Sequence, residues 1–231
     1  MAMIVVSLGG SLLYGNGGKF DAAFAKKLAA SIIVAKNSGC PLILVVGGGK
    51  RAREYANKAR AEGKGEFFAD REAIKATREN ANEMIKLLGE HAYGQVALSF
   101  DDSKNATKQN KILVSGGMLE GLTTDAVSVL FAEMVRADAV VNLGDTAGIY
   151  SADPKKDPKA LRISKMSHSE LVDLAVRNDQ RKAGTHFIFD LVASKLSARS
   201  NIELRFIDGR NLSEVAAALS GRRFRGTVVK G

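Results

Sequence analysis

The stretch Ile4-Val5-Val6-Ser7-Leu8-Gly9-Gly10-Ser11 places a pair of glycines directly after a short aliphatic run and ahead of a helical pattern. The same order of residue types recurs in Leu42-Ile43-Leu44-Val45-Val46-Gly47-Gly48-Gly49-Lys50. A glycine run at the end of a strand lets a charged ligand approach main-chain N–H groups, and the start of the following helix adds the positive end of its dipole. The two stretches therefore predict two strand–turn–helix units that hold phosphates.

A third loop, Gly121-Leu122-Thr123-Thr124-Asp125, opens the most cleanly amphipathic helical pattern of the chain. It supplies two hydroxyls and a carboxylate beside main-chain amides, although threonine and aspartate are also common helix caps. The helix after this loop carries a stripe expected to face the core, made of Val127, Leu130, Phe131 and Met134. Together the three loops predict two phosphorylated ligands that face each other.

Strand and helix patterns alternate from end to end, which favours an α/β fold: a three-layer αβα sandwich with a mainly parallel central sheet. Helices are expected over 20–38, 50–62, 67–88, 169–177, 188–199 and 212–219, and strands near 96–98, 112–114, 139–143, 204–207 and 227–229. The polar stretch from Asp101 to Lys111 predicts a surface connection or a hairpin. No linker-like segment divides the chain, so residues 1–231 are expected to form one domain with two functional halves.

Composition narrows the class of protein. The net charge is +9, but basic residues are spread among acids and only Arg222-Arg223-Phe224-Arg225 is a compact cluster, so no nucleic-acid partner is expected. No apolar run reaches the roughly 20 residues of a membrane span, and no secretory signal is recognisable, so a soluble cytoplasmic protein is expected. Cys40 is the only cysteine and fits a reducing compartment. The histidines lack ligand spacing with one another or with Cys40, so no residues that ligate a metal are predicted.

Two common phosphate-site motifs do not fit the glycine runs. The run at Gly47-Gly48-Gly49-Lys50 is not G-x-x-x-x-G-K-[ST], and no G-x-G-x-x-G occurs. These spacings disfavour a P-loop nucleoside triphosphatase and a standard dinucleotide-binding fold.

Four stretches of the sequence, taken in chain order, are similar to motifs of a known protein family. They are Ser7 to Ser11, Val45 to Tyr55, Gly121 to Val127, and Gly148-Ile149-Tyr150-Ser151-Ala152-Asp153-Pro154. Together they resemble the amino acid kinase superfamily, and within it the archaeal-type uridylate kinases. The resemblance implies transfer of the γ-phosphoryl group of ATP to UMP with Mg²⁺, an acceptor site in the amino-terminal half, a donor site in the carboxyl-terminal half, and a homohexamer.

The resemblance also implies the residues of the site. Those expected at the exchanged phosphates are Gly9, Gly10, Ser11, Lys182 and Asp125. Those expected to bind UMP are Gly47, Gly48, Arg53, Asp70, Met118, Leu119, Glu120, Gly121, Leu122, Thr123 and Thr124. Those expected to bind ATP are Gly49, Gly144, Asp145, Tyr150 and Asp153. Because the phosphate of UMP is already mostly an anion near neutral pH, Asp125 is expected to orient amides or metal-bound waters and not to act as a base.

The chain departs from the family pattern at three places. Ser7 stands where many superfamily members have a lysine, and Lys182, Lys50 or a second metal could supply the charge. Leu122 replaces the histidine of G-H-T-T-D, and the segment from Gly144 to Gly148 differs from T-N-V-D-G.

Two other functions stay open from the sequence. One is a sibling kinase that acts on another phosphate or carboxylate, such as acetylglutamate, carbamate or isopentenyl phosphate. The other is a catalytically weakened nucleotide-binding or storage protein, which Ser7 and the altered segment 144–147 motivate.

Overall fold

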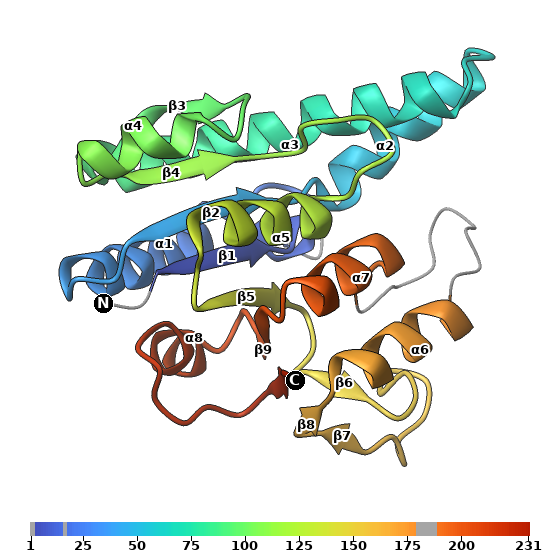
Figure 1. Ribbon diagram of the computed structural model, residues 1–231. Helices are drawn as coiled ribbons and strands as arrows, with labels where there is room; N and C mark the ends of the chain where they lie inside the picture. Colours follow the sequence, from blue (N-terminus) through green and yellow to red (C-terminus); the bar gives the residue numbers. More distant parts are fainter. Residues whose placement is uncertain (1–2, 16–17, 179–188) are drawn as a thin grey trace.

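An eight-stranded sheet runs through the computed structural model, which describes residues 3–15, 18–178 and 189–231 (Figure 1). The strands lie in the order β3-β4-β2-β1-β5-β9-β10-β8. Their bounds are Ile4–Leu8 (β1), Leu42–Val46 (β2), Ala92–Ala97 (β3), Ile112–Ser115 (β4), Ala139–Gly144 (β5), Lys165–Met166 (β8), Glu203–Asp208 (β9) and Thr227–Val229 (β10). The pair β9–β10 is antiparallel and the other pairs are parallel, so the expected mainly parallel sheet is confirmed.

The helices cover both faces of this sheet. They are α1 (Ala22–Asn37), α2 (Gly49–Ala61), α3 (Glu66–Leu88), α4 (Asp102–Lys108), α5 (Thr124–Val135), α6 (His168–Asn178), α7 (Leu191–Arg199) and α8 (Leu212–Leu219). Short 3-10 helices occupy Gly10–Leu13 (η1) and Gly89–His91 (η2), and a separate hairpin pairs β6 (Ile149–Tyr150) with β7 (Arg162–Ile163). Helices α2 and α3 form a hairpin whose tip projects beyond the sheet (Figure 1).

The central strand β1 is buried along its whole length because helices pack on both of its faces. Ile4, Val6 and Leu8 belong to a cluster shared with α1, α3 and α8. Val5 belongs to a second cluster shared with α5 and α7. The alternation of side chains along one strand thus divides the core into two layers, which is the αβα sandwich expected from the sequence.

The expectation for the stretch from Asp101 to Lys111 is wrong, because most of it forms helix α4. The Asp102 carboxylate accepts hydrogen bonds from the amides of Leu98 and Ser99 at 3.0 and 3.1 Å, which fixes the turn before the helix. Only Ser103 and Ala106 of this helix are buried, so its sequence carries no apolar stripe that a pattern search could find. The strand expected near 96–98 also begins earlier than predicted, at Ala92.

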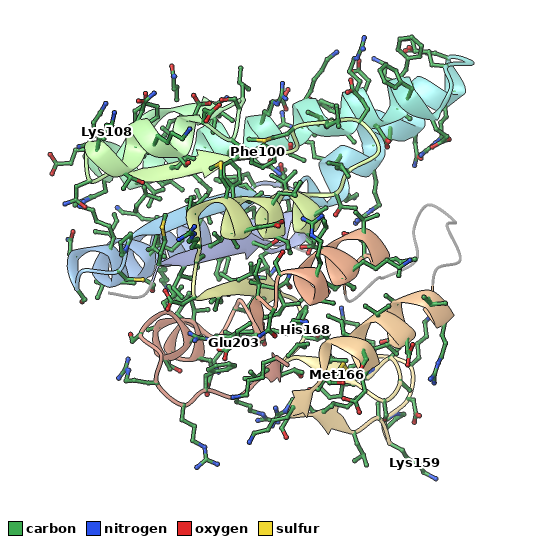
Figure 2. The ribbon with its side chains drawn as sticks, in the orientation of Figure 1. Phe100, Lys108, Lys159, Met166, His168 and Glu203 are labelled. Atoms are coloured by element: carbon green, nitrogen blue, oxygen red, sulfur yellow. The ribbon has the colours of Figure 1, made fainter. Side chains whose placement is uncertain are left out.

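The predicted core stripe of α5 is only partly correct. Val127 and Phe131 are fully buried, and the ring of Phe131 lies edge-on to that of Phe100, with 4.8 Å between centroids. Phe100, which follows β3, is labelled in Figure 2. Met134 is 39% exposed, contrary to expectation. It lies in the last turn, next to the point where Arg136, with φ of +53°, ends the helix and turns the chain toward β5. The stripe therefore reaches solvent at its carboxyl end.

Among the helices in the part of the chain that the structure describes, none is both long enough and apolar enough to cross a membrane.

Two truncations on α5 test this account of the core. Phe131→Ala should lower the free energy of unfolding by about 3–5 kcal/mol, because it removes a fully buried ring and leaves a cavity. Met134→Ala, on the same helix, should change it by about 0.5 kcal/mol or less. Urea denaturation followed by circular dichroism measures both, and equal losses would show that the surface assignment of Met134 is wrong.

Candidate functional site

Two glycine turns lie back to back at the carboxyl ends of β1 and β2: the first turn (Gly9, Gly10 and Ser11) and the second turn (Gly47, Gly48 and Gly49). A Cβ atom on Gly10 would lie 2.3 Å from the carbonyl oxygen of Gly47 and 2.4 Å from the amide nitrogen of Gly49. Gly49 also has φ of +59°, which disfavours residues with a side chain. These glycines are therefore required by the contact between the two turns.

The two turns lead into helices of different length. The second turn leads directly into the long helix α2, as expected. After the first turn comes only the four-residue helix η1, and α1 begins at Ala22. The expected contribution of a long helix's dipole to the first turn is therefore wrong, because the helix that begins there has only four residues.

The amides of these turns divide into two sets. Gly9 and Gly47 donate to the carbonyl oxygens of Leu143 and Leu8 at 2.9 and 2.8 Å, which extends the sheet into each turn. The amides of Gly10, Ser11 and Gly48 find no acceptor among the residues that the structure describes. These N–H groups are available to a ligand.

Both turns line a cavity of about 630 Å³ at the carboxyl ends of β1, β2, β5 and β9. This is where ligands of parallel α/β folds gather. Predicted site residues that line it are Gly9, Gly10, Ser11, Gly47, Gly48, Gly49, Arg53, Thr124, Asp125, Gly144, Asp145, Tyr150 and Asp153. The structure thus brings together residues separated by more than half of the chain.

Asp125 lies in this cavity with two neutral partners. The hydroxyl of Ser7 and the side-chain amide of Asn142 each donate to its Oδ1 atom at 2.9 Å. Ser7 and Asn142 lie opposite each other in the register of β1 and β5, so the sheet itself sets this pair beneath the start of α5. The arrangement leaves Asp125 Oδ2 without a hydrogen bond to any described residue.

The surroundings of Asp125 favour its protonated form. Burial raises the pKa of Asp125 to about 7, the nearby carboxylate of Asp190 adds to the increase, and the hydrogen bonds from Ser7 and Asn142 oppose it. The described residues form no ion pair with Asp125 within 4 Å. A carboxyl group that can hold a proton at neutral pH repels a bound phosphate less than a fixed anion does.

The far side of the cavity comes from the segment after β5. Tyr150 is half-buried in β6 and lines the cavity, so it is not simply a core residue. Asp145 pairs with Lys155 across the turn, and Lys155 and Arg177 add cationic groups to the lining. Sequence reasoning did not identify either cation as a site residue.

Most of the third loop does not line the cavity. The lining that the structure describes does not include seven residues predicted to bind UMP: Asp70, Met118, Leu119, Glu120, Gly121, Leu122 and Thr123. Asp70 Oδ2 instead accepts from the amide of Gly121 at 2.9 Å, and Arg71 pairs with Glu120. The structure therefore joins Asp70 to this loop, next to the cavity.

The two threonines of the third loop have separate positions. Thr123 is a helix cap, because its hydroxyl oxygen accepts from the amide of Ala126 at 3.1 Å, and it also bonds to Asp190. Thr124 lines the cavity. The sequence alone could not separate these two roles.

The sequence offered two lysines, Lys182 and Lys50, as replacements for the positive charge that is missing at Ser7. Lys182 lies outside the described residues. Lys50 does not line the cavity; its Nζ atom lies 3.8 Å from Glu54. No group of three or more His, Cys, Asp or Glu side chains that could hold a metal occurs in the described ranges.

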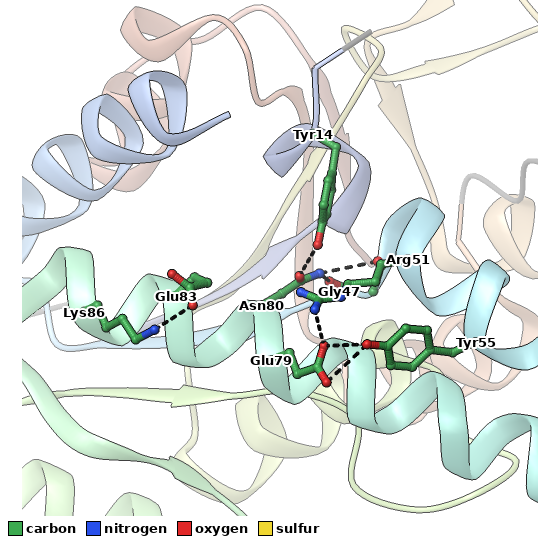
Figure 3. A network of polar contacts seen from close by, with 9 residues as sticks. Tyr14, Gly47, Arg51, Tyr55, Glu79, Asn80, Glu83 and Lys86 are labelled. Atoms are coloured by element: carbon green, nitrogen blue, oxygen red, sulfur yellow. Dashed lines mark hydrogen bonds and ion pairs between the residues drawn. The ribbon is translucent and has the colours of Figure 1, made fainter. Parts of the chain in front are cut away.

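Sequence reasoning did not identify two asparagines: Asn142, which lines the cavity, and Asn80, which contacts the second turn. Asn142 interrupts the aliphatic run of β5, and a polar residue inside a buried strand was the available signal. Asn80 is fully buried on α3 and contacts the second glycine turn (Figure 3). Its signal was weaker, because polar residues are frequent along that helix.

Comparisons with known proteins agree with this geometry. Residues 2–208 match the amino acid kinase family. A uridylate kinase of Methanocorpusculum labreanum is 41% identical over 99% of this chain and 96% of its own length. A uridylate kinase of Archaeoglobus fulgidus is 37% identical over 98% of this chain and 99% of its own length.

Solved structures are similar over the whole chain. The crystal structure of uridylate kinase from Archaeoglobus fulgidus superposes with a TM-score of 0.86 at 35% identity, covering 99% of this chain and 100% of that one. The UMP kinase of Bacillus anthracis has a TM-score of 0.83 at 20% identity, covering 99% and 96%, and shows the same fold.

The raised pKa of Asp125 predicts how stability depends on pH. Between about pH 4 and pH 7 the folded protein keeps the Asp125 proton that the unfolded chain has lost, so the contribution of Asp125 to the free energy of unfolding falls as pH rises through this interval. The Asp125→Asn variant has no such proton and keeps an oxygen for Ser7 and Asn142. It should match the wild type near pH 4 and exceed its free energy of unfolding by up to about 4 kcal/mol above pH 7. Urea titrations at several pH values measure the difference, and a constant difference would contradict the burial of Asp125.

Proposed function

The chain belongs to the amino acid kinase family, and from this premise we propose that it is a UMP kinase, which transfers the γ-phosphoryl group of ATP to UMP and gives UDP. The observation that carries the proposal is the match to uridylate kinases at 37–41% identity over nearly the full chain. The cavity supports it, because two glycine turns with free amides suit two phosphorylated ligands.

The acceptor needs little chemical activation. The second pKa of a phosphate monoester is about 6, so UMP is mostly a dianion near neutral pH and is already nucleophilic. Catalysis then consists of holding the acceptor phosphate in line with the leaving ADP and of neutralising charge. Gly10 and Ser11 are part of the cavity lining, and their amides donate to the exchanged phosphates.

The acceptor phosphate binds at the second turn. Gly48 offers an amide there, and Arg53 lies one helical turn further along α2 with its side chain in the cavity lining. A guanidinium group donates in a fork that matches phosphate oxygens. The loop from Met118 to Thr124, which Asp70 holds at Gly121, covers the uridine part of the acceptor.

The donor occupies the opposite side of the cavity. Tyr150 and Asp153, beside Gly144 and Asp145, lie against the adenine and ribose of ATP, and all four residues line the cavity. Gly49 lies between the two ligands. Lys182 supplies the positive charge that Ser7 cannot.

Magnesium fits this cavity as an ion held chiefly by phosphates. Mg²⁺ keeps several waters and takes one or two carboxylates together with substrate phosphates. Asp125, whose Oδ2 atom is free of other described partners, is the residue that would hold it or its waters. When bound, the ion neutralises charge on the transferred group.

The proposal extends to organisation. The acceptor and donor sides come from the two halves of one sheet, so the chain works as one domain over residues 1–231. A homohexamer built from dimers and a cytoplasmic location follow from the family resemblance. Light scattering coupled to gel filtration tests the assembly.

A coupled assay of ADP release tests the function. With Mg-ATP, UMP should give a kcat/KM at least tenfold above those of CMP, acetylglutamate and isopentenyl phosphate. A higher value for another acceptor would indicate a sibling kinase. ATP binding without turnover on any of the four acceptors would instead indicate a nucleotide-binding protein.

A matched pair of variants on α2 tests whether Arg53 binds the acceptor. Arg53→Ala should raise the KM for UMP about tenfold or more, because it removes a charge-assisted contact, and should leave the KM for ATP within twofold. Lys50→Ala, three residues earlier but outside the cavity lining, should change neither value. Equal KM values for UMP in the two variants would remove Arg53 from the acceptor site.

A further inference from the structure

A buried polar chain links η1, α3 and the second glycine turn (Figure 3). Asn80 is fully buried on α3, and its Nδ2 atom donates to the carbonyl oxygens of Gly47 at 2.9 Å and Gly48 at 3.3 Å. Its Oδ1 atom accepts from the hydroxyl of Tyr14 at 2.5 Å. Neither Asn80 nor Tyr14 is among the described residues that line the cavity.

The orientation of the Asn80 amide follows from its partners. Carbonyl oxygens only accept hydrogen bonds, so the NH₂ group must face Gly47 and Gly48. The oxygen must then face Tyr14, whose hydroxyl is the donor. Both amide hydrogens of Asn80 and one lone pair of its oxygen take part in hydrogen bonds. Tyr14 therefore orients Asn80, and Asn80 in turn orients the carbonyl groups of Gly47 and Gly48.

This orientation fixes the peptide planes of the second turn. In a trans peptide the C=O and the following N–H point in opposite directions. Holding the carbonyl oxygens of Gly47 and Gly48 toward Asn80 therefore directs the N–H groups of Gly48 and Gly49 away from Asn80. A rotated peptide would present a carbonyl oxygen to an anion in place of an N–H group.

The backbone conformation of the turn agrees with this arrangement. Gly48 is in the right-handed helical region (φ −87°, ψ −26°) and Gly49 has φ of +59°. This alternation of hands makes successive amides converge into a concave anion site. The amides concerned that belong to the cavity lining are those of Gly48 and Gly49, at the start of α2.

We propose that Asn80 is a positioning residue, oriented by Tyr14, which holds the second turn in the conformation that receives a phosphate. The proposal rests on the proposed function only for the identity of that phosphate as the one carried by UMP. Asn80 acts through the glycine carbonyls and touches no ligand itself.

Three variants test it. Asn80→Leu keeps the approximate volume and removes the donor, and Tyr14→Phe keeps the ring and removes the hydroxyl that orients Asn80. Glu83→Gln is the matched control, because Glu83 lies on the same helix and pairs with the exposed Lys86 (Figure 3). Dissociation constants are measured for UMP by calorimetry and for inorganic pyrophosphate by ³¹P NMR titration, with thermal unfolding recorded in parallel.

Both ligands should bind about tenfold or more weakly to Asn80→Leu and about fivefold more weakly to Tyr14→Phe, while Glu83→Gln binds as the wild type does. A purely structural role would lower the melting temperature and the active fraction but leave these dissociation constants unchanged. If Asn80→Leu does not fold, Tyr14→Phe decides. Affinities within twofold of the wild type in the folded variants would overturn the proposal.

The two probes separate this proposal from the proposed function. If wild-type protein binds pyrophosphate but not UMP, the assignment of the acceptor fails, and the variants still report on the turn through pyrophosphate. If UMP is bound and phosphorylated while the Asn80 and Tyr14 variants keep full affinity, the function stands and the positioning role fails.

Discussion

The contact between the two glycine turns is the constraint on which the rest of the site depends. Gly10 lies against Gly47 and Gly49 so closely that no Cβ atom fits between them, and this contact joins the ends of β1 and β2. The amides of Gly10, Ser11 and Gly48 belong to residues of the cavity lining and find no acceptor among the described residues. Packing between the turns requires glycine at these positions, and under the proposed function the binding of phosphates would require it as well.

Around this contact, the polar groups of the site are held mainly by neutral partners. Ser7 and Asn142 hold Asp125 from two neighbouring strands, and Asn80 holds the carbonyl oxygens of the second turn. Hydrogen bonds from neutral groups fix orientation without adding fixed charge. Under the proposed function, the charge of the two phosphorylated ligands would be compensated by basic side chains of the lining such as Arg53 and Arg177.

The sequence predicted the sheet well because its central strands are largely aliphatic: Leu42–Val46 is an unbroken aliphatic run and has the same bounds in the prediction and in the structure. Prediction from the sequence failed where the burial of a residue or the boundary of a helix depends on contacts with residues far away in the sequence. Helix α4 buries only two small residues, Met134 lies where α5 ends, and the first turn leads to η1 and not directly to α1. In the site, the glycine turns were visible as motifs, but the Ser7–Asp125–Asn142 cluster arises from strand register between residues more than 100 positions apart, which no local pattern encodes.

The most direct test of the central contact is the turnover of Gly10→Ala with UMP and Mg-ATP, compared with Gly15→Ala. A Cβ atom at Gly15 would meet nothing within 4 Å, whereas at Gly10 it would force the two turns apart. The account predicts that Gly10→Ala loses about 100-fold or more in kcat/KM while it still unfolds cooperatively, and that Gly15→Ala stays within twofold of the wild type. A folded Gly10→Ala variant with wild-type kcat/KM would contradict the dependence of the site on this contact.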